Sequence, residues 1–92
     1  MEKLVKEMMK SARRWATTDN GRLDFTNVYA NNIWFGVCNV LLSYKHYKRY
    51  HDYVSKEDTE NRLQMLAYDV KMLNDKVITN MYRDLEKMLQ GV

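Results

Sequence analysis

The spacing of apolar residues predicts a first amphipathic helix over about residues 2–16. Apolar side chains recur every three or four positions, from Leu4 through Met8 and Ala12 to Trp15. Five basic residues occupy the other side of this segment: Lys3, Lys6, Lys10, Arg13 and Arg14. An apolar stripe opposite a charged face is typical of a surface helix in a small bundle.

The helical pattern stops at residues 17–26, where Thr-Thr-Asp-Asn-Gly has poor helix propensity and predicts a loop. The stretch that begins at Asp19 is similar to the second half of an EF-hand calcium loop, with Gly21 at the turn position. The first and last ligand positions are Ala16 and Asn27, where an EF-hand requires carboxylates. We therefore expect an interhelical loop and no calcium site.

A second, longer helix is predicted over about residues 27–54, with Thr26 or Asn27 as its N-cap. Its apolar seam keeps the alternating spacing of four and three residues that is typical of helix bundles. The positions of this seam are Ala30, Ile33, Val37, Val40, Tyr44, Tyr47, His51 and Val54.

A third helix is predicted over about residues 56–90, with Ser55 as its N-cap. Its seam runs from Leu63 through Leu66, Val70, Leu73 and Val77, then shifts register to Met81, Leu85 and Met88. The sequence thus predicts a single all-α domain over residues 1–92, with a short N-terminal helix and a long antiparallel hairpin. Because the third helix outlasts the second, we also expect a homodimer that completes a helical bundle.

A polar and aromatic stripe runs beside the seam of the second helix. Its members are Asn32, Gly36, Asn39, Ser43, His46, Tyr50 and Tyr53. Helix interiors seldom carry such residues in one line without a reason. Two interpretations stay open: the first helix packs on this stripe, with Trp15 over Gly36, or the stripe contacts a partner.

Charge and cysteine content limit the classes of binding partner and the cellular compartment that we expect. The net charge is +3, and residues 1–54 carry +4 while residues 55–92 carry −1, so the basic half suits nucleic acid or an acidic protein surface. Cys38 is the single cysteine, which excludes an intramolecular disulfide. No signal-peptide pattern is present, and the apolar run of residues 33–42 is too short to span a membrane. We expect a cytoplasmic protein, with the interior of an infected host cell as one setting.

Candidate catalytic chemistry is not found in the sequence, which predicts no enzyme and no cofactor. There is no glycine elbow around a serine, no phosphate-binding glycine loop and no Cys–His pair with an orienting group. His46 and His51 are five residues apart on a predicted helix, so their rings diverge by about 140° and do not share a metal ion.

The preferred hypothesis is a small non-catalytic interaction protein that binds and modulates a larger protein or nucleoprotein machine. The chain is rich in Asn, Lys, Tyr and Met, a composition that resembles that of phage and mobile-element proteins. Anti-CRISPR inhibitors offer an analogy to this chain in size and composition only. The candidate partner-binding residues are His46, Tyr50, Tyr53, Lys45, Lys48 and Arg49.

The first alternative is a nucleic-acid-binding protein that uses the basic faces of the first two helices. The candidate contacts are Lys3, Lys6, Lys10, Arg13, Arg14, Lys45, Lys48 and Arg49. The second alternative is a structural helical subunit of a ribonucleoprotein or a homo-oligomer.

Overall fold

The computed structural model describes residues 1–15 and 27–90, and these residues form four α-helices. Their bounds are Glu2–Trp15 (α1), Val28–Tyr50 (α2), Tyr53–Leu73 (α3) and Lys76–Leu89 (α4). The predicted all-α class is confirmed. The predicted loop over residues 17–26 lies outside the described residues. So does the stretch compared to an EF-hand, except for Asn27 at its last position.

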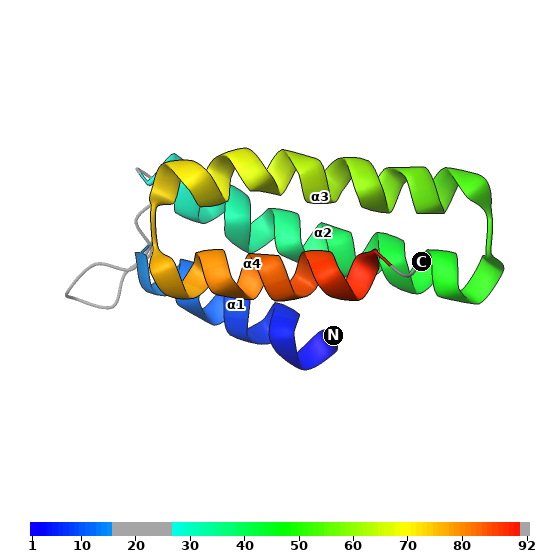
Figure 1. Cartoon of the computed structure of the whole chain (residues 1–92), viewed down its shortest axis with the longest axis horizontal. Coiled ribbons are helices and arrows are strands. Elements are labelled where there is room, and N and C mark those ends of the chain that lie inside the picture. Colours follow the sequence, from blue (N-terminus) through cyan, green and yellow to red (C-terminus); the bar gives the residue numbers. More distant parts are fainter. Residues whose placement is uncertain (16–26, 91–92) are drawn as a thin grey trace.

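The four helices form a closed ring around one core (Figure 1). Helix α2 packs against α1 and α3, and α4 packs against α1 and α3 in turn. Helices α2 and α3 have 23 and 21 residues, whereas α1 and α4 have 14 each. At 1.5 Å per residue, α2 is about 34 Å long and the two short helices are about 21 Å long.

All four helices contribute to the core. The largest fully buried side chains are Met8, Ile33, Leu66, Ile78, Leu85, Val5, Val37 and Val40. The predicted seams are confirmed from Ala30 to Val40 in α2 and from Leu63 to Val70 in α3. Beyond those spans the seams are confirmed in part. Leu85 is buried, and Tyr44, Leu73 and Met81 are partly buried against the core. Other predicted seam positions are exposed because the turns lie elsewhere than expected.

The predicted single helix over residues 56–90 is in fact two helices, because the chain reverses at Asn74 and Asp75. Asn74 adopts a left-handed conformation with φ of 56°, which ends α3. Asp75 then caps α4, since its Oδ1 accepts a hydrogen bond from the Ile78 backbone N–H at 3.0 Å. Helix α4 folds back and buries Ile78, whereas Val77, a predicted seam residue, is exposed.

The turn between α2 and α3 comes earlier than predicted, at His51 and Asp52 instead of residues 54–56. His51 has φ of 53° and its N–H donates to the Tyr47 carbonyl, which ends α2. Asp52 is the N-cap of α3, so Ser55 lies in the first turn of that helix. The predicted placement of His51 and Val54 in the core is therefore wrong, and both side chains are exposed.

The polar stripe of α2 faces α3 and not α1. Asn32 donates from Nδ2 to Asp69 Oδ1 at 3.1 Å, and Ser43 donates to Asp58 Oδ2 at 2.5 Å. A Cβ placed on Gly36 would lie 2.7 Å from Leu66 Cδ2, so this glycine allows α3 to approach closely.

The interpretation in which the first helix packs on this stripe, with Trp15 over Gly36, is therefore wrong. The Trp15 indole N–H instead donates to Asp75 Oδ2 at 2.7 Å, which ties the end of α1 to the start of α4.

Candidate functional site

The connection between α2 and α3 projects beyond the two short helices, at the right of Figure 1. Helix α1 begins beside Lys45, whose Nζ lies 2.6 Å from Glu2 Oε1. Helix α4 ends at Leu89, which shares a shallow surface hollow with Glu60 and Leu63 of α3. Residues 46–55, which we call the hairpin tip, thus lie past the ends of both short helices.

A network of short polar contacts fixes the backbone of the hairpin tip. Asp52 Oδ2 accepts hydrogen bonds from the backbone N–H of Ser55 at 3.1 Å and from its hydroxyl at 3.0 Å. Nδ1 of His46 bonds the same hydroxyl oxygen, and Thr59 donates to the Ser55 carbonyl at 2.7 Å. The end of α2 is thereby joined to the first turn of α3.

The charge states in the hairpin tip follow from these bonds. The hydrogen bond from the Ser55 hydroxyl holds the pKa of the Asp52 carboxyl below its usual value, with a smaller contribution from the charge of His46. The Ser55 hydroxyl oxygen lies within hydrogen-bond distance of both Asp52 Oδ2 and His46 Nδ1, so it links the two side chains. Asp52 is accordingly an ionised helix cap at neutral pH.

Ser55, His46 and Asp52 do not have the geometry of a catalytic relay. In a Ser–His–Asp relay the imidazole bridges the other two residues through its two different nitrogens. Here Ser55 Oγ and Asp52 Oδ1 both lie at Nδ1, the latter at 3.4 Å, and the serine is buried. The arrangement is that of a helix cap.

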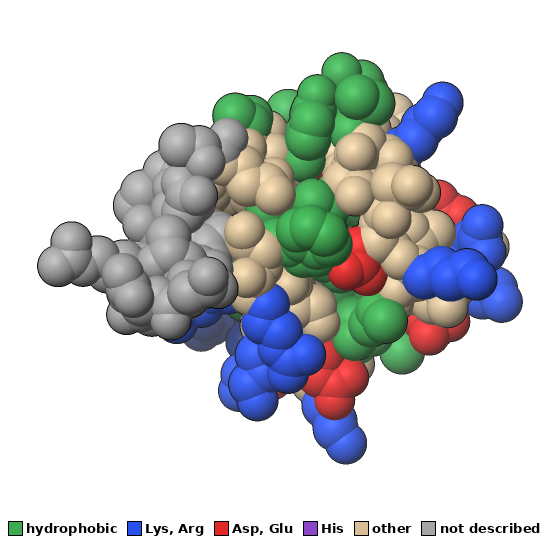
Figure 2. All heavy atoms as spheres, turned by 90° about the vertical axis from the view of Figure 1, so that its left-hand side faces the viewer, with side chains coloured by type: hydrophobic (Ala, Val, Ile, Leu, Met, Phe, Trp, Pro, Cys, Tyr) green, Lys and Arg blue, Asp and Glu red, His purple; other side chains and the backbone are tan. Residues whose placement is uncertain are grey.

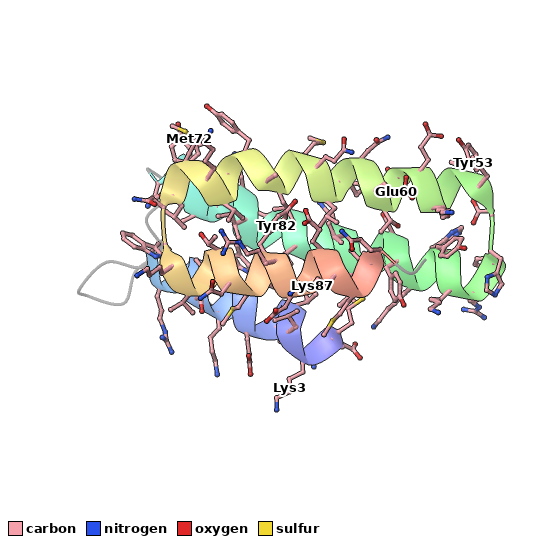
Figure 3. The ribbon with its side chains drawn as sticks, viewed as in Figure 1. Lys3, Tyr53, Glu60, Met72, Tyr82 and Lys87 are labelled. Carbon is pink, nitrogen blue, oxygen red and sulfur yellow. The ribbon has the colours of Figure 1, made fainter. Side chains whose placement is uncertain are left out.

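Aromatic side chains cover the outside of the hairpin tip. Tyr50 is 59% exposed and Tyr53, at the right-hand end of α3 in Figure 3, is 74% exposed. The His46 ring lies against Tyr50 with centroids 4.6 Å apart, and the Arg49 guanidinium lies 5.5 Å from the Tyr50 centroid. Tyr50 therefore contacts an imidazole and a cation while much of its surface stays open.

The structure brings together only part of the predicted partner-binding set. His46, Arg49 and Tyr50 form one contacting group, with Tyr53 across the turn. Lys45 is paired with Glu2, which also lowers the pKa of the glutamate. Lys48 lies over the ring of Tyr44, with its Nζ 5.7 Å from the centroid.

The basic residues of α1 make a more mixed surface than the sequence predicts. Lys3, Lys6 and Lys10 line a shallow surface with Glu2 and Glu7, and Lys3 points away from the bundle (Figure 3). Arg13 lies over the ring of Trp34 at 5.3 Å, and Arg14 is exposed near the end of the helix.

Metal ligation is not indicated by the side chains of residues 1–15 and 27–90. Within these ranges no three His, Cys, Asp or Glu side chains are grouped so that they would hold an ion. His46 and His51 belong to different contacts, the first with Tyr50 and the second with Tyr47.

The polar stripe of α2 has apolar neighbours on the outer side of α2 and α3 that the sequence pattern did not identify as a surface. Val28, Phe35 and Leu42 are exposed on α2 at intervals of seven residues, and Met65 and Tyr68 are exposed on α3. The interval of seven was a visible signal, but apolar residues at helical spacing are ordinarily assigned to a core.

Comparisons of the chain with protein-family models, with curated proteins and with solved structures gave no match. Among the described helices, none combines the length and the apolar character needed to cross a membrane. Any functional assignment therefore rests on the geometry of the chain itself.

Proposed function

We propose that this protein is a non-catalytic interaction protein that docks on a larger protein or nucleoprotein through its hairpin tip. The observation that carries the proposal is the exposure of Tyr50 and Tyr53 on a capped hairpin that projects beyond α1 and α4. Tyrosines supply large contact areas at low conformational cost and are enriched among residues that dominate binding energy.

The charge around the two tyrosines indicates the chemistry of the partner surface. Arg49 lies on Tyr50, and Lys48 lies in the last turn of α2. A partner patch with carboxylates around an apolar pocket matches this combination of cations and aromatic rings. Modulation or inhibition of the partner, as by small phage-encoded inhibitors, is the outcome we propose for docking, by analogy of size and composition.

The test is affinity capture from native host cells with three forms of the protein. The wild type, the double variant Tyr50→Ala/Tyr53→Ala and the control Val77→Ala are used as baits at equal concentration, after circular dichroism confirms equal helicity. Val77 is a comparably exposed apolar residue at the start of α4, at the opposite end of the bundle from the hairpin tip. The proposal expects a partner that the wild type and Val77→Ala retain and the double variant loses. Equal retention by all three forms would refute it.

Direct binding of nucleic acid is the second candidate, and one contact favours it. The ion pair between Glu2 and Lys45 places the basic residues at the start of α1 beside those at the end of α2. If this surface binds nucleic acid, affinity must fall steeply with salt, because each neutralised phosphate releases counterions. A mobility-shift series from about 50 to 200 mM salt, with Lys48→Glu/Arg49→Glu as the variant, decides this. No shift at the lowest salt excludes the candidate.

A further inference from the structure

A second surface, independent of the hairpin tip, carries an inference of its own. The outer side of α2 and α3 holds a groove of about 670 Å³, which we call the outer groove. Its lining residues include Val28, Asn32, Phe35 and Asn39 of α2 and Arg62, Met65, Tyr68 and Asp69 of α3. At one end of the bundle, Figure 2 shows hydrophobic side chains gathered at the upper edge, over α3.

The outer groove is far more apolar than the outside of a bundle needs to be. Six large apolar side chains on this side of α2 and α3 are between 44% and 72% exposed: Val28, Phe35, Leu42, Met65, Tyr68 and Met72. At roughly 100 Å² each they leave on the order of 600 Å² of apolar surface. That approaches the roughly 800 Å² that each partner contributes to a stable interface, and contiguous patches of this size mark interaction sites.

The exposed residues on this side of α2 are nearly symmetric about Phe35. The apolar residues Val28 and Leu42 lie seven residues away on either side, Val28 in the groove and Leu42 beyond its lining. Asn32 precedes Phe35 by three residues and Asn39 follows it by four. A two-fold contact centred at Phe35 therefore brings apolar ends against apolar ends, which makes the surface complementary to a second copy of itself.

The same centre is repeated on α3. Met65 lies between Arg62 and Asp69, which are seven residues apart and opposite in charge. The close approach of Leu66 to Gly36 places the centres of the two helices at the same level of the bundle. A two-fold rotation about that level therefore carries Arg62 to the place of Asp69.

We propose that the outer groove binds a second copy of this chain, in an isologous dimer whose two-fold axis passes at Phe35 and Met65, perpendicular to the helices. Helix α2 then crosses α2 of the second copy in antiparallel orientation, and α3 crosses α3 likewise. Met65 meets Met65, and Arg62 faces Asp69 of the other copy at two equivalent places. The charge match is self-complementary, which is the condition for a closed two-fold dimer.

The charged groups have the freedom that this contact needs. The Arg62 side chain is 42% exposed and is bonded to Asp58 on its own helix at 2.8 Å. Asp69 accepts from the exposed amide of Asn32 and has a second carboxylate oxygen for an incoming guanidinium.

Cross-linking tests the position of the two-fold axis. In a Cys38→Ala background, Met65→Cys places a thiol where the axis brings two copies of one position together. Gln64→Cys is the matched control, because the neighbouring side chain is exposed but faces the α4 side of α3. Mild oxidation is expected to convert Met65→Cys to a disulfide dimer at least tenfold faster than Gln64→Cys. Equal rates would overturn the proposal.

Charge exchange tests the pairing itself by sedimentation velocity. Arg62→Asp and Asp69→Arg each place like charges opposite one another, so each alone is expected to weaken self-association at least tenfold. Mixing the two variants restores both opposite-charge contacts, so the mixture is expected to form a heterodimer as tight as the wild-type dimer. A mixture that stays monomeric overturns the proposal. A wild-type protein that stays monomeric up to millimolar concentration also overturns the proposal. The same holds if its outer groove binds a different protein instead of a second copy.

Discussion

Asp75 holds the reversal between α3 and α4, and its removal should be among the most damaging single changes outside the core. One carboxylate oxygen accepts the Ile78 backbone N–H at 3.0 Å and the other accepts the Trp15 indole N–H at 2.7 Å. The bond from Ile78, followed by that from Trp15, keeps the pKa of this carboxyl below its usual value. One side chain thus caps α4 and attaches the end of α1 to it.

The magnitude of the effect of Asp75→Ala follows from the two bonds. Loss of an N-cap costs about 1 kcal/mol. Loss of the hydrogen bond from Trp15, which is 49% exposed, adds about 0.5–1 kcal/mol. The expected decrease in the free energy of unfolding is therefore about 1.5–2 kcal/mol, which lowers the Tm of a domain of this size by about 10 °C.

Urea unfolding followed by circular dichroism at 222 nm measures this change. Trp15→Phe removes only the indole N–H and should cost about 0.5–1 kcal/mol. Asp75→Asn keeps an oxygen for Ile78 but turns an amide toward the indole, so it should cost as much as Trp15→Phe. A double-mutant cycle isolates the coupling between the two residues. An Asp75→Ala protein within about 0.3 kcal/mol of the wild type would refute this account of the turn.

Three further outcomes are expected. The pKa values of the Asp52, Asp58 and Asp75 carboxyls lie below the ordinary 3.8. The stability that these groups contribute is therefore complete above pH 3.8 and declines as the pH falls through the lowered values. Urea unfolding between pH 6 and 2 should show a decrease in the free energy of unfolding, and a constant value would contradict this. Burial raises the pKa of Tyr82 to about 12, with a smaller effect from Glu86. An absorbance titration should therefore show one tyrosine that ionises near that pH, and Tyr82→Phe should remove this step. The free energy of unfolding should decline as the pH rises from 10 toward 12. Asn74 has a φ of 56°, a conformation that costs alanine more than asparagine or glycine. Urea unfolding should show that Asn74→Ala lowers the free energy of unfolding by about 1 kcal/mol and that Asn74→Gly does not. Equal effects of the two substitutions would show that the positive φ does not determine which residue is favoured at this position.

The core seams were predictable because their signal is local and repeated. Four-and-three spacing places Ala30 to Val40 on one face of a helix wherever the remainder of the chain goes. The reversal at Asn74 was missed because it contains neither Gly nor Pro, and its signal, an Asn that can end a helix followed by an Asp that can cap one, is weaker. It depends on Ile78 and Leu85 being buried, a gain that exists only after α4 has folded back over the core.

The hairpin tip likewise contains residues that the sequence predicts and residues that it does not. Sorting by helical angle put Tyr50 and Tyr53 off the seam, and both are exposed. The partners that fix the hairpin tip, Asp52 and Ser55, depend on where α2 ends, and a periodic pattern gives no end point. The outer groove was predictable only in part. Its residues Asn32, Gly36 and Asn39 form part of the predicted stripe, but the exposure of Phe35 and Met65 depends on which faces of α2 and α3 the other helices cover.

The most direct test of the central claim is the dissociation constant of the captured partner for three purified forms of the protein. Two tyrosines that dominate an interface contribute at least about 2 kcal/mol each, so their joint removal should weaken binding by on the order of 700-fold or more. The account predicts this loss for Tyr50→Ala/Tyr53→Ala and a change below about twofold for Val77→Ala. A folded double variant that binds the partner as tightly as the wild type would contradict the assignment of the hairpin tip.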